Sequence, residues 1–270
     1  MIKIFYFIKR LLNHPNKLKY FLCRLLLRTN LGRFLKIKRN GYTVRLSENN
    51  VASEMFIQGK NFYHDEEKFI KSLIKNDSTF IDIGANIGNL SLAAANIIND
   101  GKIIAIEAHP KTYRSMLQNI NDNAKNIDAY NLAVGDESGE IYLTDFSADD
   151  CNHISKENIN NNVAINIDTI DNILGHDVGK IDLLKIDVEG FELMVLKGAK
   201  ITLSKTKYIY FELWDKLTEK FKYSGSEIID LLRKHNFEIF NLNNFAIGDE
   251  VKKRQFPEIG EYLAISNISK

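Results

Sequence analysis

The chain has 270 residues, of which 44% are hydrophobic and 26% are charged, and its formal net charge is +1. This composition is that of a folded protein with one α/β-sized core, and it excludes a disordered chain. The only cysteines, Cys23 and Cys151, lie far apart, which excludes a disulfide framework and a four-cysteine zinc site. We therefore expect a reducing, cytoplasmic location.

Positive charge is concentrated at the N-terminus. Residues 1–40 contain eleven Lys or Arg and no Asp or Glu, so the rest of the chain carries a net charge of about −10. Basic residues recur every seven positions beside apolar residues at helical spacing, which predicts a basic amphipathic helix that restarts at Pro15. Basic residues also interrupt the apolar runs, so neither a signal peptide nor a membrane-spanning helix is expected. We divide the chain into an N-terminal extension, residues 1–48, and one domain, residues 49–270.

Two roles are open for this extension. It packs against the domain or a second subunit in a homodimer, which is the favoured interpretation, or it lies on the anionic inner face of a membrane through residues 1–40. A nucleic-acid partner is not expected, because the extension has no recognisable nucleic-acid-binding motif and the rest of the chain is acidic.

The next elements form a strand, a glycine turn, a helix and a second strand. The apolar run 80–83 stops at Gly84, and a helix is favoured from residue 90. Glu107 follows Gly84 by 23 residues and ends the next apolar run, 103–106. An acidic residue at this offset accepts hydrogen bonds from the ribose hydroxyls of a nucleotide cofactor.

The spacing of the glycines indicates which cofactor. Gly84 and Gly88 flank Asn86, which stands where a dinucleotide-binding turn has the glycine that lets the backbone approach a pyrophosphate. The carboxylate of Asp82 beside the turn suits the positive charges of S-adenosylmethionine and disfavours a phosphate. S-adenosylmethionine is therefore favoured, and a nicotinamide-dependent oxidoreductase is the alternative.

The segment after Glu107 alternates helices, strands and turns. A helix begins at Pro110, a third strand covers 129–134, including Ala133, and 141–144 form a hairpin or an antiparallel return. Residues 147–162 are polar and rich in asparagine, which predicts a mobile loop that either closes over the acceptor or has no function. His153 in this loop is a weak candidate for a catalytic base.

The remaining elements complete an α/β fold. A fourth strand ends at Asp187, a helix follows, and Ser224 with Glu227 has the form of a capping box at the start of a later helix. The expected strands are 182–186, 208–214, 237–240 and 262–265, and the expected helix after Asp187 covers 192–205. Alternating strands and helices predict a Rossmann-like sheet, mostly parallel, with a reversed closing strand.

Several of these segments together resemble the FkbM-type methyltransferases. The resemblance is carried by residues 79–110, 166–174 and 181–199, and its most specific block is Leu-Lys-Ile-Asp-Val-Glu-Gly-Phe-Glu at 184–192. It covers about residues 50–215. It implies a Rossmann-like methyltransferase fold, S-adenosylmethionine as the methyl donor, and O-methylation of a hydroxyl of a glycan, a lipid-linked sugar or a natural product. The acceptor is not named by the resemblance.

Three carboxylates are predicted to act in catalysis. Asp187, Glu189 and Glu192 lie within six residues at the end of a central strand, where one of them deprotonates the acceptor hydroxyl directly or through Mg²⁺. For Glu192 the alternative is stabilisation of a helix N-terminus. We expect His109 to shape the adenine side of the cofactor site, and it is a weaker candidate for a base.

These arguments assign individual residues to the predicted cofactor site. The cofactor-binding residues are expected to be Asp82, Gly84, Asn86, Gly88, Glu107, Ala133 and Asp187. No metal ligand is assigned. A non-catalytic scaffold on the same fold remains a second alternative, which the intact carboxylates disfavour.

Overall fold

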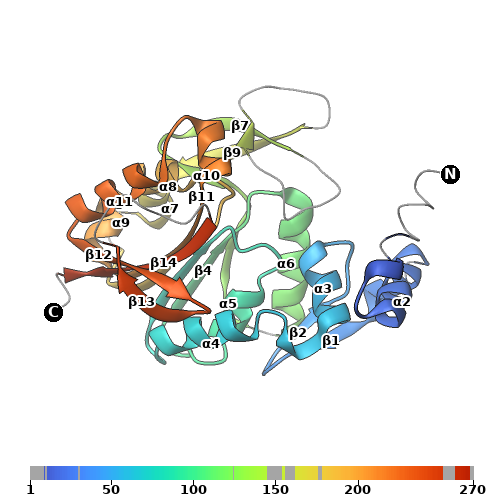
Figure 1. The fold of residues 1–270 in the computed structure, drawn as a ribbon. Helices are drawn as coiled ribbons and strands as arrows, with labels where there is room; N and C mark the ends of the chain where they lie inside the picture. The colour runs from blue at the N-terminus through green and yellow to red at the C-terminus, as the bar shows by residue number, and fades with distance from the viewer. Residues whose placement is uncertain are drawn as a thin grey trace.

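A computed structural model of the chain describes residues 9, 11–29, 31–123, 125–144, 154–155, 162–175, 178–251 and 259–267. An eight-stranded sheet runs through the middle of the molecule, and helices cover both of its faces (Figure 1). The sheet order is β13-β12-β14-β11-β10-β3-β4-β5. Its strands are β3 (Thr79–Ile83), β4 (Lys102–Ile106), β5 (Asp128–Tyr130), β10 (Ile181–Ile186), β11 (Thr206–Trp214), β12 (Phe237–Asn243), β13 (Ala246–Glu250) and β14 (Ile259–Ser266).

The strand directions agree with the predicted architecture. The five strands from β11 to β5 are mutually parallel, whereas β14 runs antiparallel to both of its neighbours, β11 and β12. The predicted α/β fold with a mostly parallel sheet and a reversed closing strand is therefore confirmed. The reversed strand lies inside the sheet, because β12 and β13 continue it beyond β14.

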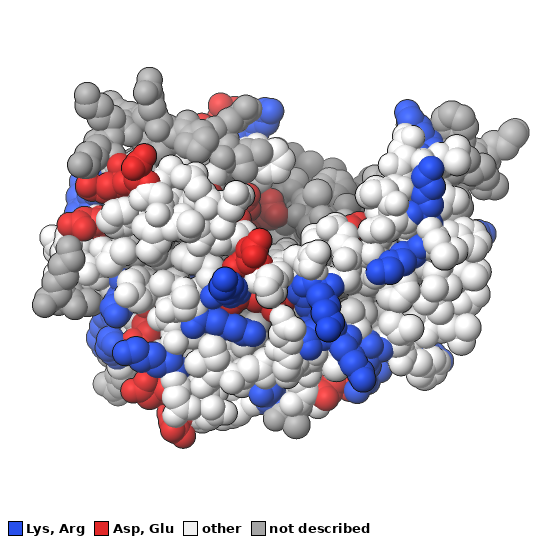
Figure 2. Space-filling view, turned by 60° about the horizontal axis from the view of Figure 1, so that its bottom comes forward, with Lys and Arg blue, Asp and Glu red and all other residues white. Residues whose placement is uncertain are grey.

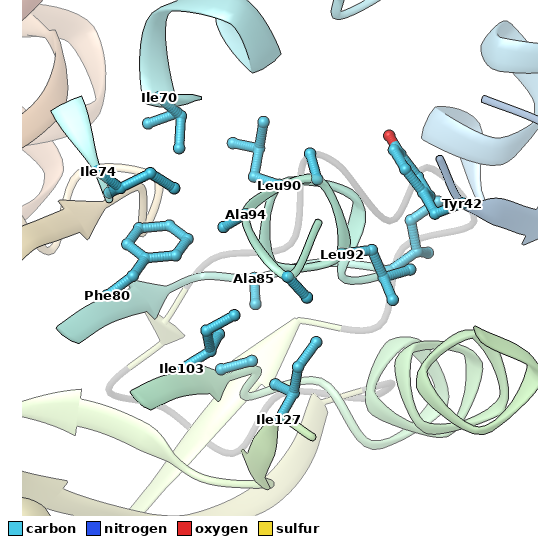
Figure 3. Close-up of a cluster of buried hydrophobic side chains, with 14 of the residues drawn as sticks. Tyr42, Ile70, Ile74, Phe80, Ala85, Leu90, Leu92, Ala94, Ile103 and Ile127 are labelled. Carbon is cyan, nitrogen blue, oxygen red and sulfur yellow. The ribbon is translucent and has the colours of Figure 1, made fainter. Parts of the chain in front are cut away.

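Helices pack on both faces because the strands are apolar on both sides. In β3, Phe80 points to the face covered by α4 and α5, and Ile81 points to the face covered by α8, α9 and α11. Figure 3 shows Phe80 and Ile103 of the sheet beneath Leu90 and Ala94 of α5. The helices are α2 (Lys17–Arg28), α3 (Asn50–Gln58), α4 (His64–Leu73), α5 (Asn89–Ala94), α6 (Pro110–Asn123), α7 (Ile170–Leu174), α8 (Glu192–Lys197), α9 (Lys200–Lys205), α10 (Asp215–Thr218) and α11 (Gly225–Lys234). Single 3-10 turns occur at η1 (Gly32–Phe34), η2 (Gly59–Asn61) and η4 (Glu219–Phe221).

A second sheet of four strands lies beside the main one and was not predicted. Its order is β6-β9-β7-β8, with β6 (Ala133–Gly135), β7 (Gly139–Thr144), β8 (Ile154–Ser155) and β9 (Asn162–Thr169). The predicted third strand, 129–134, is divided between the two sheets as β5 and β6. At the division, the Asn131 side chain donates hydrogen bonds to the carbonyl oxygens of Glu107 and Ala108 at 2.8 and 3.0 Å. These bonds hold the chain where it leaves the main sheet.

The predicted helix 192–205 is also divided, into α8 and α9. The carboxylate of Asp171, in α7, accepts hydrogen bonds from the backbone N–H groups of Ile201 and Thr202, each at 2.8 Å. A carboxylate at this place satisfies the first N–H groups of α9, so a new helix begins there. The Ser224–Glu227 capping box is present at the start of α11, as predicted.

The N-terminal segment contacts the rest of the chain at several points. Helix α2 buries Tyr20 and Cys23 in a cluster with Leu46 and Ile57. A two-stranded sheet, β1 (Lys36–Lys38) with β2 (Thr43–Arg45), follows it. Arg39 forms an ion pair of 2.7 Å with Glu67 of α4, and both side chains are almost fully buried. Within the described part of the chain, no helix is long and apolar enough to cross a membrane.

Candidate functional site

A tight glycine turn connects β3 to α5. Gly84 has φ +77°, and a Cβ atom there would lie 1.8 Å from the carbonyl oxygen of Asp187. Only glycine lets the backbone of the turn approach the end of β10 so closely. Gly88, at φ +80°, precedes the first residue of α5. Asn86, between them, also has positive φ, and its side-chain oxygen accepts a hydrogen bond from Asn49 at 2.9 Å.

Glu107 follows β4 and connects the turn to the next strand. One carboxylate oxygen accepts the N–H of Asn86 at 2.9 Å, and the other accepts the N–H of His109 at 2.7 Å. Burial raises the pKa of Glu107 to about 7, although these two backbone hydrogen bonds act in the opposite direction. Each oxygen can accept a further hydrogen bond, so the carboxylate suits a ligand that brings two donors.

A cavity opens at the carboxyl ends of the strands, beside the glycine turn. It is lined by Val51, Tyr63, Ile83, Gly84, Asn86, Ile106, Glu107, Ala108, His109, Leu132, Ala133, Val134, Leu143, Ile154, Asp187, Val188, Glu189 and Glu212. Four of these described lining residues are carboxylates, and none is Lys or Arg. The lining therefore favours a ligand with positive charge over one with phosphate groups.

Asp187 stands at the end of β10 and is fixed by a buried lysine. Its carboxylate lies 3.2 Å from Lys185 Nζ and is 41% exposed. Lys185 Nζ also lies 3.3 Å from the carboxylate of Asp82 and donates a hydrogen bond to the carbonyl oxygen of Gly84 at 2.9 Å. Burial alone would lower the pKa of Lys185, but the neighbouring carboxylates, Asp187 foremost, outweigh it and raise that pKa. Lys185 is thus a buried ion-pair partner of both Asp82 and Asp187.

Asp82 lies beneath the turn and not in the cavity lining. It is fully buried, and its second oxygen accepts a hydrogen bond from the Ser91 hydroxyl of α5 at 2.6 Å. Its contacts are therefore with Lys185 and α5. In this position it orients the lysine that supports both Gly84 and Asp187.

The two glutamates after β10 occupy different environments. Glu189 lines the cavity and has positive φ. Glu192 is buried away from the lining, where its carboxylate accepts the N–H of Gly190 at 3.0 Å and the Tyr223 hydroxyl at 3.1 Å. Burial raises the pKa of Glu192 to about 7. Its carboxylate accepts hydrogen bonds in the loop at the start of α8, and Glu192 is not among the described lining residues of the cavity, whereas Asp187 and Glu189 are.

The other predicted residues are placed as follows. Gly84, Asn86, Glu107, Ala133 and Asp187 line the cavity, whereas Gly88 does not. Among the described residues, no group of three His, Cys, Asp or Glu side chains is placed to hold a metal ion, so nothing here supports the Mg²⁺ alternative.

Histidines and the predicted loop complete this comparison. His109 lines the cavity and is buried. His153 lies outside the described residues, as do 147–153 and 156–161 of the predicted loop. Ile154, within that loop, belongs to β8 and lines the cavity.

Sequence reasoning missed several residues that line the cavity. Val51 of α3, Tyr63 before α4, and Glu212 near the end of β11 complete the lining. Glu212 carried a usable signal, because it sits near the carboxyl end of a predicted strand, where ligands bind in such sheets. Val51 and Tyr63 both precede the glycine turn by more than twenty residues, and nothing local in the sequence connects them to it.

Sheet, glycine turn and acidic cavity together are those of a cofactor-binding protein of the Rossmann-like class. The model of the methyltransferase FkbM domain matches residues 82–239, which is more than half of the chain. The chain belongs to this family of methyltransferases, as the resemblance in its sequence indicated.

Individual relatives are more distant. The hexuronic acid methyltransferase AglP of Haloferax volcanii is 24% identical over 215 residues, which cover 76% of this chain and 87% of AglP. The AMB antimetabolite synthetase AmbE of Pseudomonas aeruginosa is 26% identical over 60% of this chain, which spans only 10% of AmbE. Among solved structures, a methyltransferase FkbM from Methylobacillus flagellatus is 16% identical, with a TM-score of 0.45 over 80% of this chain and 52% of that one.

Proposed function

We propose that the chain is an S-adenosylmethionine-dependent O-methyltransferase that acts on a hydroxyl of a glycan, a lipid-linked sugar or a natural product. The observation that carries the proposal is the cavity, whose described lining holds four carboxylates and no Lys or Arg. A cofactor with a sulfonium and an ammonium group matches this charge. The pyrophosphate of a nicotinamide cofactor does not, which disfavours the oxidoreductase alternative.

The residues of the turn fit this cofactor. Glu107 presents a buried carboxylate that is satisfied only in part by backbone N–H groups, and the two ribose hydroxyls would supply the further donors. Gly84 and Asn86 would leave room for the ligand beside the end of β3, and Ala133 would contribute to the opposite side. Bound there, S-adenosylmethionine would supply an electrophilic methyl group on a positively charged sulfur.

Asp187 and Glu189 are the proposed groups for the acceptor. Both line the cavity, and the ion pair with Lys185 holds Asp187 in place. A carboxylate here accepts a hydrogen bond from the acceptor hydroxyl and takes its proton as the oxygen becomes a nucleophile. Glu192 is left out of this role, because its carboxylate is occupied by Gly190 and Tyr223.

A sugar acceptor is supported by the relative AglP, whose name assigns it a hexuronic acid. Its alignment with this chain covers 76% of this chain and 87% of AglP. We therefore place hydroxyls of sugars, uronic acids among them, first among the acceptor classes.

Two measurements test the proposal. Calorimetry should show binding of S-adenosylmethionine and none of NAD, and a non-catalytic scaffold would bind without turnover. Incubation with methyl-labelled S-adenosylmethionine and a panel of sugars, uronic acids and glycolipids should then yield a labelled methyl ether, detected by mass spectrometry. Binding of NAD in place of S-adenosylmethionine would overturn the proposal.

The base is tested by amide variants. Glu189→Gln and Asp187→Asn should lower turnover by about 10²–10⁴-fold in at least one case, because a general base contributes about that factor. Glu140→Gln, at an exposed carboxylate of β7, is the matched control. Normal turnover in both site variants would remove these residues from the role and leave His109 or His153 as candidates.

A further inference from the structure

Helix α2 has an apolar stripe that the described protein leaves exposed. Leu18 is 80% exposed, and Phe21, Leu22 and Leu25 are 45%, 42% and 45% exposed. These four residues follow the spacing i, i+3, i+4 and i+7, so they lie on one face of the helix. Packing of α2 on the protein does not explain these apolar residues, because the opposite face of the helix is the one that buries Tyr20 and Cys23.

Basic side chains border this stripe along its length. At 100° per residue, Lys17 and Arg28 fall on one side of the stripe and Lys19 falls on the other. Arg24 falls beside Lys17 and stacks on the ring of Tyr20, with its guanidinium 5.3 Å from the ring centroid. Helix α2 contains no acidic residue, and residues 1–40 contain none.

Figure 1 places α2 at the edge of the molecule, with α3 beside it. In Figure 2 that end of the surface shows blue side chains among white ones. Beyond the helix, Leu31 and Phe34 are exposed as well, and the guanidinium of Arg33 lies 4.6 Å from the centre of the Phe34 ring. The exposed apolar and basic residues thus form one continuous part of the sequence.

We propose that α2 attaches the protein to an anionic lipid surface, with the stripe Leu18, Phe21, Leu22 and Leu25 inserted among the lipids. At about 1.5 Å per residue, twelve residues give a helix of roughly 18 Å, which lies in the interface and does not cross the bilayer. Long basic side chains at the borders of the stripe reach the phosphate level while their stems stay in contact with the apolar layer.

A second copy of the chain fits this surface less well. In a twofold dimer the same surface faces itself, so the basic borders of one stripe would meet those of the other. The segment offers no carboxylate to pair with them. Anionic lipid headgroups supply the complementary charge along both borders, whereas a copy of this helix adds more of the same sign.

The experiment is co-sedimentation of the full-length protein with vesicles that contain phosphatidylglycerol, and with vesicles of phosphatidylcholine alone. We expect binding to the former at low salt and a steep loss at high salt. The variant Leu18→Ser/Leu22→Ser should weaken vesicle binding by about a hundredfold or more, because two leucine side chains are no longer transferred from water into the lipid. Ile247→Ser, at an exposed apolar residue of β13, is the matched control.

Charge is tested separately. The variant Lys17→Gln/Lys19→Gln/Arg28→Gln should lose about a hundredfold in binding at low salt, whereas Lys200→Gln/Lys220→Gln/Lys234→Gln should bind as the parent does. All six side chains are exposed, so the thermal midpoint should not move.

Three results would overturn the proposal. They are equal binding to neutral and anionic vesicles, no binding by the parent protein, and unchanged binding of the leucine variant. Analytical ultracentrifugation gives a further one: a parent dimer that becomes monomeric in Leu18→Ser/Leu22→Ser would make the stripe a subunit interface. Methyl transfer to a water-soluble acceptor is not required in any arm, so failure here is distinct from failure of the proposed enzymatic function.

Discussion

At the scale of single residues, the site depends on a few polar side chains whose environments the fold sets. Glu107 directly follows β4 and Glu192 is the first residue of α8, and burial raises the pKa of each to about 7. Glu107 nevertheless lines the cavity, whereas Glu192 closes a loop. The same residue type therefore has two environments, and the neighbouring hydrogen-bond donors distinguish them.

Replacement of Glu107 should weaken binding of S-adenosylmethionine. Hydrogen bonds to a charged group contribute about 1.5–3 kcal/mol each, so Glu107→Ala should lower the affinity by about ten- to a hundredfold or more. Calorimetry measures the change, with Glu137→Ala, at an exposed carboxylate, as the control. Because Glu107 also accepts the N–H of Asn86, the thermal midpoint of the variant must be measured beside the affinity. Unchanged affinity in a folded variant would remove Glu107 from the site.

The raised pKa of Glu107 predicts how binding depends on pH. The ribose hydroxyls donate hydrogen bonds to the ionised carboxylate, so binding of S-adenosylmethionine requires Glu107 to lose its proton. Affinity for S-adenosylmethionine should therefore fall as the pH drops through about 7, approaching tenfold per unit below it. Calorimetry over this range should show a flatter dependence for Glu107→Gln. An equal slope in both proteins would assign the titration to another group.

The same shift has the opposite sign for stability. Burial raises the pKa of Glu107 above its ordinary value of 4.5, so the folded state binds this proton more tightly than the unfolded state does. Its contribution to stability is complete below about pH 4.5 and is lost as the pH rises through about 7. The carboxylate is thus kept at a cost in stability, which is consistent with a role in binding.

At the scale of elements, the local sequence pattern predicts most strands of the main sheet and the helices that cover it. It does not predict where one predicted strand and one predicted helix are each divided in two. The apolar runs of β3, β4 and β10 are short, buried and bounded by polar residues, which is sufficient to place them. The divisions between β5 and β6 and between α8 and α9 depend on Asn131 and Asp171, which bind backbone groups far away in the sequence. No local periodicity records such contacts.

Asp171 should therefore be important for stability. Its carboxylate accepts two backbone N–H groups and the Thr202 hydroxyl at the start of α9. Loss of a cap of this kind costs about 0.5–2 kcal/mol, so Asp171→Ala should lower the free energy of unfolding by roughly that amount. Denaturant unfolding monitored by circular dichroism measures it. Asp230→Ala, at an exposed position of α11, should have little effect, and equal losses in the two variants would contradict the capping role.

At the scale of the whole molecule, the N-terminal segment and the domain share buried contacts. Tyr20 and Cys23 lie in one cluster with Leu46 and Ile57, and Arg39 pairs with Glu67 inside the protein. The division at residue 48 proposed from the charge pattern stays a prediction. These contacts show what a truncation there would disturb.

Removal of residues 1–40 should destabilise the protein. It would leave the buried carboxylate of Glu67 without its guanidinium partner, a change that typically costs about 3–5 kcal/mol, and it would expose the apolar cluster around Ile57. Thermal unfolding of this truncation should show a clearly lower midpoint than that of the full chain. Removal of residues 1–8 alone, which keeps each of these contacts, is the control. A core that lacks 1–40 yet melts like the parent would establish the extension as an independent unit.

The sequence by itself determined the class of fold, the glycine turn and the position of Glu107. Each of these rests on residues close together in the chain, where apolar period, glycine and strand ends act locally. Only the tertiary structure decided that Asp82 lies beneath the turn and that Tyr63 and Glu212 complete the cavity. It alone showed that α2 has one apolar face on the protein and another exposed. Burial and charge pairing depend on segments brought together by folding, so no local pattern specifies them.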